Sequence, residues 1–284
     1  MKWTPGTEND DVVDQRGSRV SAGTLTGGGL AAAVVVVIVA RLFGVDISGL
    51  LGSGGSSAPT QPSNQAHPPA GHDPDKPLVD FVKAVMKDIQ DTFEAKFQAA
   101  GKPYRHAKLV LFTQAVDTGC GRSSAAIGPF YCPPDERAYI DLSFYRELRQ
   151  RFGAPGDFAQ AYVLAHEIGH HLQKLMGVEH KAQALSKNHN RNEISVETEL
   201  QADCFAGVWG HEAQGKHLLE AGDLEEAITA ATAIGDDRLQ KQAGHEVNPE
   251  TFTHGTSAQR VRWFRKGFDT GRFDACDTFS ASAL

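Results

Sequence analysis

Apolar residues recur at spacings of three and four over several long stretches of this chain. This pattern predicts amphipathic helices over five ranges, namely 77–100, 158–176, 194–209, 223–234 and 261–268. Two short runs rich in apolar and β-branched residues, at 108–113 and 138–142, predict strands. Helices therefore dominate, and the expected fold class is α+β, mostly helical with a small β-sheet.

Capping signals support three of these helices. Each has a polar N-cap candidate followed three residues later by a Gln or Glu: Asp157 with Gln160, Asp223 with Glu226, and Thr256 with Gln259. Gly177 follows the second helix directly, as is typical of a helix end.

The first 76 residues lack this helical pattern. Residues 1–22 are polar and rich in Asp and Gly, which predicts a disordered tail. Residues 23–51 are apolar apart from Arg41 and Asp46, and the run before Arg41 is at the lower limit for spanning a bilayer. Residues 52–76 are rich in Gly, Ser and Pro and predict a flexible linker to a domain at 77–284.

The distribution of basic residues predicts how such a segment would lie in a membrane. Arg16 and Arg19 precede it, and after Arg41 no Lys or Arg occurs until Lys76. Basic residues favour the cytoplasmic side, so we expect a single-pass protein of the cell membrane with a cytoplasmic tail 1–22 and an extracytoplasmic domain. A cleaved signal peptide is the competing interpretation, but the segment before the apolar run is long and acidic.

Four cysteines fall in the domain, and their spacing matches no CxxC metal site. An even number of cysteines outside the cytoplasm indicates two disulfides with three possible connectivities. We favour Cys120–Cys132, which closes a short loop rich in Gly and Pro, and Cys204–Cys276, which ties the C-terminal segment to a helix.

Charge and motifs exclude some classes of function. The net charge is −7 and no long basic run occurs, so nothing favours nucleic-acid binding. Neither of the glycine-rich phosphate-binding patterns, GxxxxGK[ST] or GxGxxG, is present.

The strongest chemical signal is the sequence His166-Glu-Ile-Gly-His170 within the helix predicted at 158–176. On a helix, residues four apart lie on one face, so the two imidazoles can bind one Zn²⁺, and Glu167 can act on a water at the metal. The alternative is a helix that carries two solvated or core-packed histidines without a metal.

A catalytic zinc site needs a third protein ligand. Gln173 and Met176 stand where a metzincin would have Gly and His, which excludes that class. Glu199 and Asp203 are four residues apart on the next helix, so one can bind the metal while the other accepts the outer N–H of a ligating histidine. We assign Glu199 as the ligand and Asp203 as the acceptor; Glu193 is the weaker alternative ligand.

These motifs together resemble a known family. His166-Glu-Ile-Gly-His170 followed by Glu199-Leu-Gln-Ala-Asp203 is similar to the gluzincin arrangement of HExxH and a downstream E-x-x-A-D. More closely, the chain resembles the neutral zinc metallopeptidases that are membrane-anchored in bacteria, over residues 77–279 and the glycine-rich segment before them. Further matching stretches are Cys120-Gly, Gly128-Pro-Phe-Tyr-Cys-Pro133, Tyr139-Ile-Asp-Leu-Ser-Phe144, Cys204-Phe-Ala-Gly-Val-Trp209 and His254-Gly-Thr-Ser-Ala-Gln-Arg-Val-Arg-Trp-Phe264. The resemblance implies a zincin-like fold, Zn²⁺ and the hydrolysis of peptide or protein substrates.

The expected mechanism is hydrolysis of a peptide bond by a zinc-activated water. Glu167 is the expected general base. His254 and Arg260 are the candidates to stabilise the developing oxyanion, and Arg260 can equally be the partner of a structural ion pair. The strand at 138–142 is a candidate to pair with an extended substrate.

Two alternatives come from other classes of protein. One is a membrane-tethered sensor that holds structural zinc, although such sites prefer cysteine and four protein ligands. The other is a catalytically inactive scaffold, in which nothing would require a carboxylate at position 167.

Overall fold

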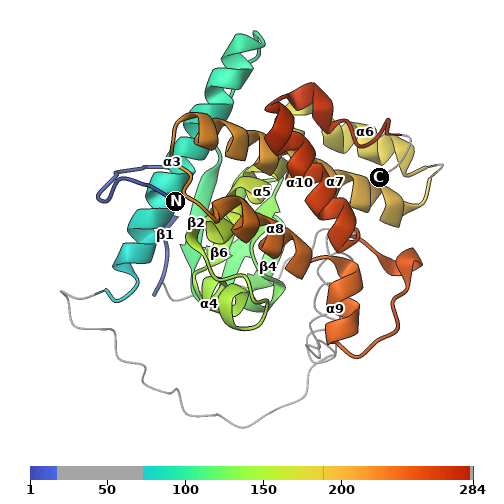
Figure 1. The fold of residues 1–284 in the computed structure, drawn as a ribbon, viewed down its shortest axis with the longest axis horizontal. Helices are drawn as coiled ribbons and strands as arrows, with labels where there is room; N and C mark the ends of the chain where they lie inside the picture. Colours follow the sequence, from blue (N-terminus) through green and yellow to red (C-terminus); the bar gives the residue numbers. More distant parts are fainter. Residues whose placement is uncertain (18–72, 188, 282–283) are drawn as a thin grey trace.

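A computed structural model describes residues 1–17, 73–187, 189–281 and 284 of the chain (Figure 1). The predicted membrane segment 23–51 and nearly all of the linker 52–76 lie outside these residues. The helices are α3 (Lys76–Ala99), α4 (Ser143–Gln150), α5 (Asp157–Met176), α6 (Val178–Leu185), α7 (Arg191–Gly215), α8 (Asp223–Ala233), α9 (Asp236–Gln242) and α10 (Ser257–Thr270). The strands are β1 (Val12–Asp14), β2 (Lys108–Phe112), β3 (Ala115–Thr118), β4 (Gly121–Ser124), β5 (Phe130–Cys132) and β6 (Arg137–Asp141). The α+β prediction, mostly helical with small sheets, is confirmed.

The larger sheet has the strand order β1-β2-β6-β5. β1, β2 and β6 run parallel to one another, and β5 is antiparallel to β6. β6 was the strand expected to pair with a substrate, but β2 and β5 already occupy its two edges. Among the described strands, β5 and β1 are the edges of this sheet. β3 and β4 form a separate antiparallel hairpin.

The N-terminal residues differ from the sequence prediction. Residues 1–17 were expected to be a disordered tail, but Val12–Asp14 pair with Leu109–Leu111 as strand β1. The ring of Trp3 packs edge-on against Phe81 of α3 at 5.6 Å between centroids. In Figure 1 this blue segment runs along α3. Its few apolar residues are too sparse to show a period, and the neighbouring strand supplies the pairing that orders them.

Helix α5 lies at the centre of the domain. It packs against α7, α8 and α3 and also contacts β5 and β6 (Figure 1). Every residue from Phe158 to Gly169 is buried, including the polar ones. A helix that is enclosed all round has no solvated face, so its polar residues need partners inside the protein.

Helices α7 and α10 cross at very short range because each has a glycine at the crossing. A Cβ on Gly207 would lie 2.0 Å from the carbonyl oxygen of Phe264, and one on Gly267 would lie 1.9 Å from that of Cys204. The disulfide Cys204–Cys276 closes beside this crossing, and Cys120–Cys132 joins the turn before β4 to β5. Both predicted cysteine pairs are confirmed.

Only one of the three predicted capping boxes forms. Thr256 and Gln259 make both reciprocal bonds at the start of α10. Asp157 and Asp223 are instead the first residues of their helices, and their carboxylates lie 2.6 and 3.3 Å from the Met1 α-ammonium nitrogen. Within the described ranges, no helix is both long enough and apolar enough to cross a membrane.

The α7–α10 crossing makes a stability prediction. Gly207→Ala places a methyl group inside the contact distance of the α10 backbone, and we expect a loss of about 1–3 kcal/mol or more in the free energy of unfolding. Urea denaturation measures it. Gly215→Ala at the end of the same helix is the control, because its Cβ would meet nothing within 4 Å. Equal denaturation midpoints for the two variants would contradict the close contact between the backbones of α7 and α10.

Candidate metal centre

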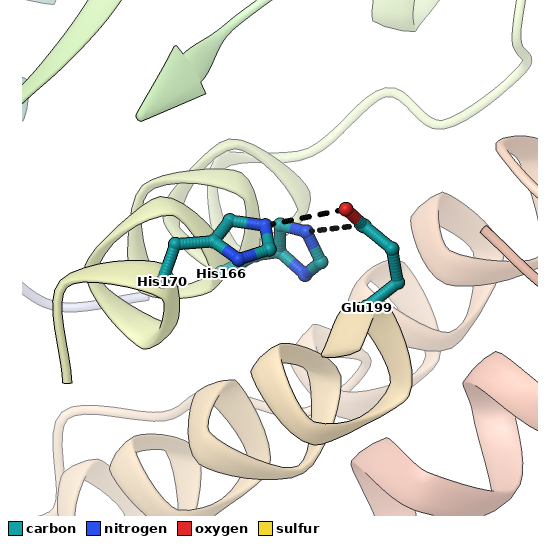
Figure 2. A group of neighbouring side chains, drawn as sticks. All are labelled: His166, His170 and Glu199. Carbon is teal, nitrogen blue, oxygen red and sulfur yellow. Dashed lines mark hydrogen bonds and ion pairs between the residues drawn. The ribbon is translucent and has the colours of Figure 1, made fainter. Parts of the chain in front are cut away.

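The two histidines of the HExxH sequence project from α5 toward α7 (Figure 2). Their ring centroids are 4.9 Å apart. Glu199 faces both rings from α7: its Oε2 lies 3.2 Å from His166 Nε2, and its Oε1 lies 3.5 Å from His170 Nε2. One ligand atom from each of the three residues lies within 4.8 Å of the others. The sequence therefore identified a set of three side chains that the fold brings together.

The short distance between Glu199 and the two histidines depends on Gly169, the glycine inside the HExxH sequence. A Cβ on Gly169 would lie 2.9 Å from the carbonyl oxygen of Ala202 and 3.0 Å from its Cα. The backbones of α5 and α7 therefore touch at this point. Any larger residue at position 169 would push α7 away from the histidines.

The Nδ1 atom of His166, which is not the nitrogen that faces Glu199, has a buried hydrogen-bond partner. This atom lies 2.9 Å from Asp203 Oδ1, as the spacing of Glu199 and Asp203 predicted. Asp203 has no exposed surface, and Tyr162 donates a further hydrogen bond to its Oδ1. Arg260 binds both carboxylate oxygens, with Nε donating to Oδ2 at 2.8 Å and Nη2 donating to Oδ1 at 2.9 Å. Arg260 thus lies behind the histidine as an ion-pair partner of Asp203.

The outer nitrogen of His170 is held by a residue that the sequence reasoning did not assign. Its Nδ1 donates to Gln173 Oε1 at 2.9 Å. The amide of Gln173 donates in turn to the carbonyl oxygen of Thr198 on α7 at 2.6 Å. The i, i+3 spacing of His170 and Gln173 on one helix face was the signal that could have revealed this pair.

Burial and neighbouring charges shift the pKa values of the two glutamates in the site. Burial alone raises the pKa of the Glu199 carboxyl, but three neighbouring imidazoles outweigh it and hold that pKa well below its usual range. Those imidazoles belong to His170, His254 and His166. Burial also raises the pKa of Glu167, and here the opposing effect of the imidazoles is insufficient.

His254 approaches the same site from the loop before α10. Its Nδ1 lies 3.2 Å from Asp236 Oδ1. Asp236 is fully buried at the start of α9, and its Oδ2 accepts the backbone N–H groups of Thr253, His254 and Gly255. Burial lowers the pKa of His254, but the carboxylates of Glu199 and Asp236 outweigh this and raise it. Asp236 is a second residue that the sequence reasoning did not assign.

Other acidic residues lie elsewhere. Glu193, the alternative third ligand, is exposed in the first turn of α7. A second cluster with metal-like spacing consists of Asp157, Asp223 and Glu226, and the first two of these carboxylates bind the Met1 α-ammonium.

Comparison with known proteins adds a family to this geometry. The family described as "Putative neutral zinc metallopeptidase" matches residues 1–279. This chain belongs to that family. Similar members include the "Uncharacterized protein YpfJ" of Escherichia coli (strain K12), which is 46% identical over 294 residues that cover 99% of this chain and 100% of that protein.

Mycobacterial members are also similar. The "Uncharacterized protein Rv2575" of Mycobacterium tuberculosis (strain ATCC 25618 / H37Rv) is 43% identical over 215 residues, which cover 72% of this chain and 73% of that protein. No solved structure matches the chain. The family match covers residues 1–17 together with the metal centre, in agreement with their packing in one domain.

The donor set makes a prediction about metal content. We expect about one Zn²⁺ per chain, and His166→Ala, His170→Ala or Glu199→Ala should abolish tight binding because two remaining ligands are too few. Elemental analysis of the purified chain measures this. The matched control is His180→Ala, which removes an exposed histidine of α6 and should leave the zinc content unchanged. Full zinc content in a His166/His170 double variant would overturn the assignment.

The groups behind the histidines make a separate prediction. Asp203→Asn keeps the shape of the side chain but removes its charge, and we expect zinc affinity to fall about 10–100-fold, against near-complete loss for Glu199→Gln. Gln173→Met should weaken binding in the same direction through His170, without leaving the buried charge of Arg260 unpaired. Competition with a chromophoric zinc chelator measures the affinities.

The order of the two carboxylate variants decides their roles. If Asp203→Asn abolished binding while Glu199→Gln retained it, the ligand and the supporting residue would have been assigned the wrong way round. Urea denaturation of Asp203→Asn shows separately how much of any loss comes from destabilisation.

Proposed function

We propose that this member of the family is a zinc-dependent metallopeptidase that hydrolyses peptide bonds in extended substrates. The observation that carries the proposal is the convergence of His166, His170 and Glu199 beside the buried carboxylate of Glu167. A structural or sensory zinc site accounts for the three ligands, but it gives no reason to bury a fourth ionisable group next to them.

The donor set suits zinc. Two imidazole nitrogens and one carboxylate oxygen are ligands that Zn²⁺ prefers, and three protein ligands leave a position open for chemistry. The contacts of Asp203 and Gln173 with the Nδ1 atoms direct both Nε2 atoms toward the metal position. A zinc ion held there supplies Lewis acidity, which acidifies water and polarises a carbonyl group.

Glu167 is the proposed general base. No side chain in the described part of the chain donates a hydrogen bond to its carboxylate, which leaves the oxygens available to water. Burial raises the pKa of Glu167 toward the operating range of an acid–base catalyst. Glu167 therefore takes a proton from the attacking water and delivers it to the leaving amine.

His254 is the proposed stabiliser of the developing oxyanion. Asp236 holds its Nδ1, and no described residue hydrogen-bonds the other ring nitrogen, Nε2, which can donate toward a substrate. Asp236 also fixes the backbone on both sides of His254 through three N–H groups. A donor held in place before the reaction loses little energy to reorganisation when charge develops.

The substrate is proposed to lie along β5. β5 is an edge strand, and its backbone can pair with an extended peptide, whereas β6 has no free edge. Tyr131 of β5 donates to Nδ1 of His171 on α5 at 2.9 Å, because the Nε2–H of His171 is already bonded to the carbonyl oxygen of Arg105. This contact fixes the edge strand to the helix that carries the metal ligands.

The disulfides support a proposed location. Two closed disulfides persist in oxidising compartments, so we propose that the metallopeptidase domain works outside the cytoplasm. The apolar run 23–51 is the proposed attachment to the membrane, and it lies outside the described residues.

Two variants test the chemistry. Glu167→Gln should retain zinc and lose nearly all peptidase activity, since only the base is removed. His254→Ala should also retain zinc and lower kcat about 10²–10³-fold, which is typical for loss of one oxyanion donor. Mass spectrometry of a peptide library incubated with the full chain measures cleavage, and elemental analysis measures zinc.

His180→Ala again serves as the control and should cleave like the wild type. If the zinc-loaded wild type cleaved no peptide in the library, the scaffold or sensor interpretation would replace the peptidase. Full activity in Glu167→Gln would remove Glu167 from the mechanism but leave the metal site intact.

A further inference from the structure

Residues on the two sides of the segment 18–72 meet in the structure. Arg16 precedes this segment and Asp73 follows it. Arg16 Nη2 lies 2.6 Å from Asp73 Oδ2, and Arg16 Nη1 lies 3.5 Å from Asp75 Oδ2. The two flanks of the segment 18–72 are therefore in direct contact.

The residues before this point are part of the sheet. Leu109 N donates to the carbonyl oxygen of Asp11 at 2.7 Å, and Gln15 N donates to that of Leu111 at 2.8 Å. Together with the register of Val12–Asp14 on β2, these bonds satisfy the backbone along one edge of β2. An unpaired edge at this position would leave exposed donors and acceptors.

Side chains of the same segment fit specific partners on α3 and β2. Asn9 Nδ2 donates to the carbonyl oxygen of Lys83 at 3.1 Å. Asp11 lies 2.6 Å from His106 Nδ1 and accepts from Lys108 Nζ at 2.8 Å. These contacts involve two separate elements of the domain, so the segment is held along its length and not only at one residue.

We propose that residues 1–17 lie on the same side of the membrane as the metal centre. The hydrocarbon core of a bilayer is about 30 Å thick, and one crossing between residues 17 and 73 would separate them by that distance. The Arg16–Asp73 ion pair and the β1–β2 pairing are incompatible with such a separation.

The distribution of basic residues predicts instead a cytoplasmic tail 1–22 and an extracytoplasmic domain. The assignment of residues 1–17 to one side of the membrane rests on the proposed membrane attachment. The packing of residues 1–17 on the domain does not depend on that attachment. The positive-inside rule counts Arg16 as a free charge near the apolar run. In the structure this guanidinium is already paired with Asp14 and Asp73.

A cross-link tests the packing in the full-length chain. Glu8 Oε2 and Lys83 Nζ are 2.9 Å apart, so a Glu8→Cys/Lys83→Cys pair should be joined by a short bis-maleimide. The native cysteines are in disulfides and do not react. Mass spectrometry of digested membranes should show the 8–83 cross-link, and not the link in Glu8→Cys/Lys241→Cys, whose second residue lies on α9 across the domain (Figure 1).

Cysteine labelling tests on which side of the membrane residues 1–17 and the domain lie. Thr4→Cys and Ala184→Cys are exposed positions on the N-terminal segment and on α6. In spheroplasts, a membrane-impermeant maleimide should label both before lysis, or neither if the domain is inside the cell. The second result would overturn the proposed extracytoplasmic location but support the same-side inference.

Two results overturn the inference. One is labelling of Ala184→Cys in intact spheroplasts with Thr4→Cys protected until lysis, or the reverse. The other is absence of the 8–83 cross-link although each single cysteine reacts with the reagent. If the chain is found in the soluble fraction, the membrane attachment fails, and the cross-link alone decides the packing.

Discussion

The metal centre depends on the contact between the backbones of α5 and α7 at Gly169. A Cβ at this position would lie 2.9 Å from Ala202 O, so only glycine allows the two helices to touch here. Glycine within a helix costs roughly 0.5–1 kcal/mol relative to alanine. In return, glycine allows α5 and α7 to come into direct contact. Ala202 lies between Glu199 and Asp203, so the contact brings one carboxylate to the Nε2 side of His166 and the other to its Nδ1 side.

The Asp203–Arg260 ion pair orients the acceptor of the His166 N–H, and its burial has a cost in desolvation. Asp203 and Arg260 are both almost fully buried, and removing such charges from water costs several kcal/mol for each ion. The two bonds from Arg260 and the bond from Tyr162 offset this cost by keeping Asp203 fully hydrogen-bonded. An apolar pair could not accept the N–H of His166. An anionic acceptor buried beside His166 needs a cationic partner, and Arg260 supplies it.

The parts of the fold that follow from local pattern were predicted from the sequence. The periodicity of residues 158–176 and Gly177 located α5 to within one residue, and the run at 108–113 located β2. The three residues at the metal position were also found from sequence, because i, i+4 spacing on a helix places side chains on one face.

The parts that depend on distant partners were not predicted. β1 is three residues long, and it pairs with β2, nearly a hundred residues later in the chain. The sequence around Asp157 and Asp223 predicts helix caps, yet their carboxylates bind the Met1 α-ammonium. Met1 is too far away in the sequence for a local pattern to predict this contact. Asp236 was missed for the same reason, since its contact with His254 is made across 18 residues.

Helix α10 couples the oxidation state of the cysteines to the metal centre. His254 lies just before this helix, and Arg260 within it binds Asp203. The Gly207–Gly267 crossing and the Cys204–Cys276 disulfide hold α10 and the segment after it against α7. The disulfide spans 72 residues, and such a loop closure removes roughly 4 kcal/mol of chain entropy from the unfolded state. Oxidation of this cysteine pair therefore stabilises the same helix that orients His166 through Asp203 and that follows His254 in the chain. The geometry of the candidate metal centre is in this way linked to one covalent bond.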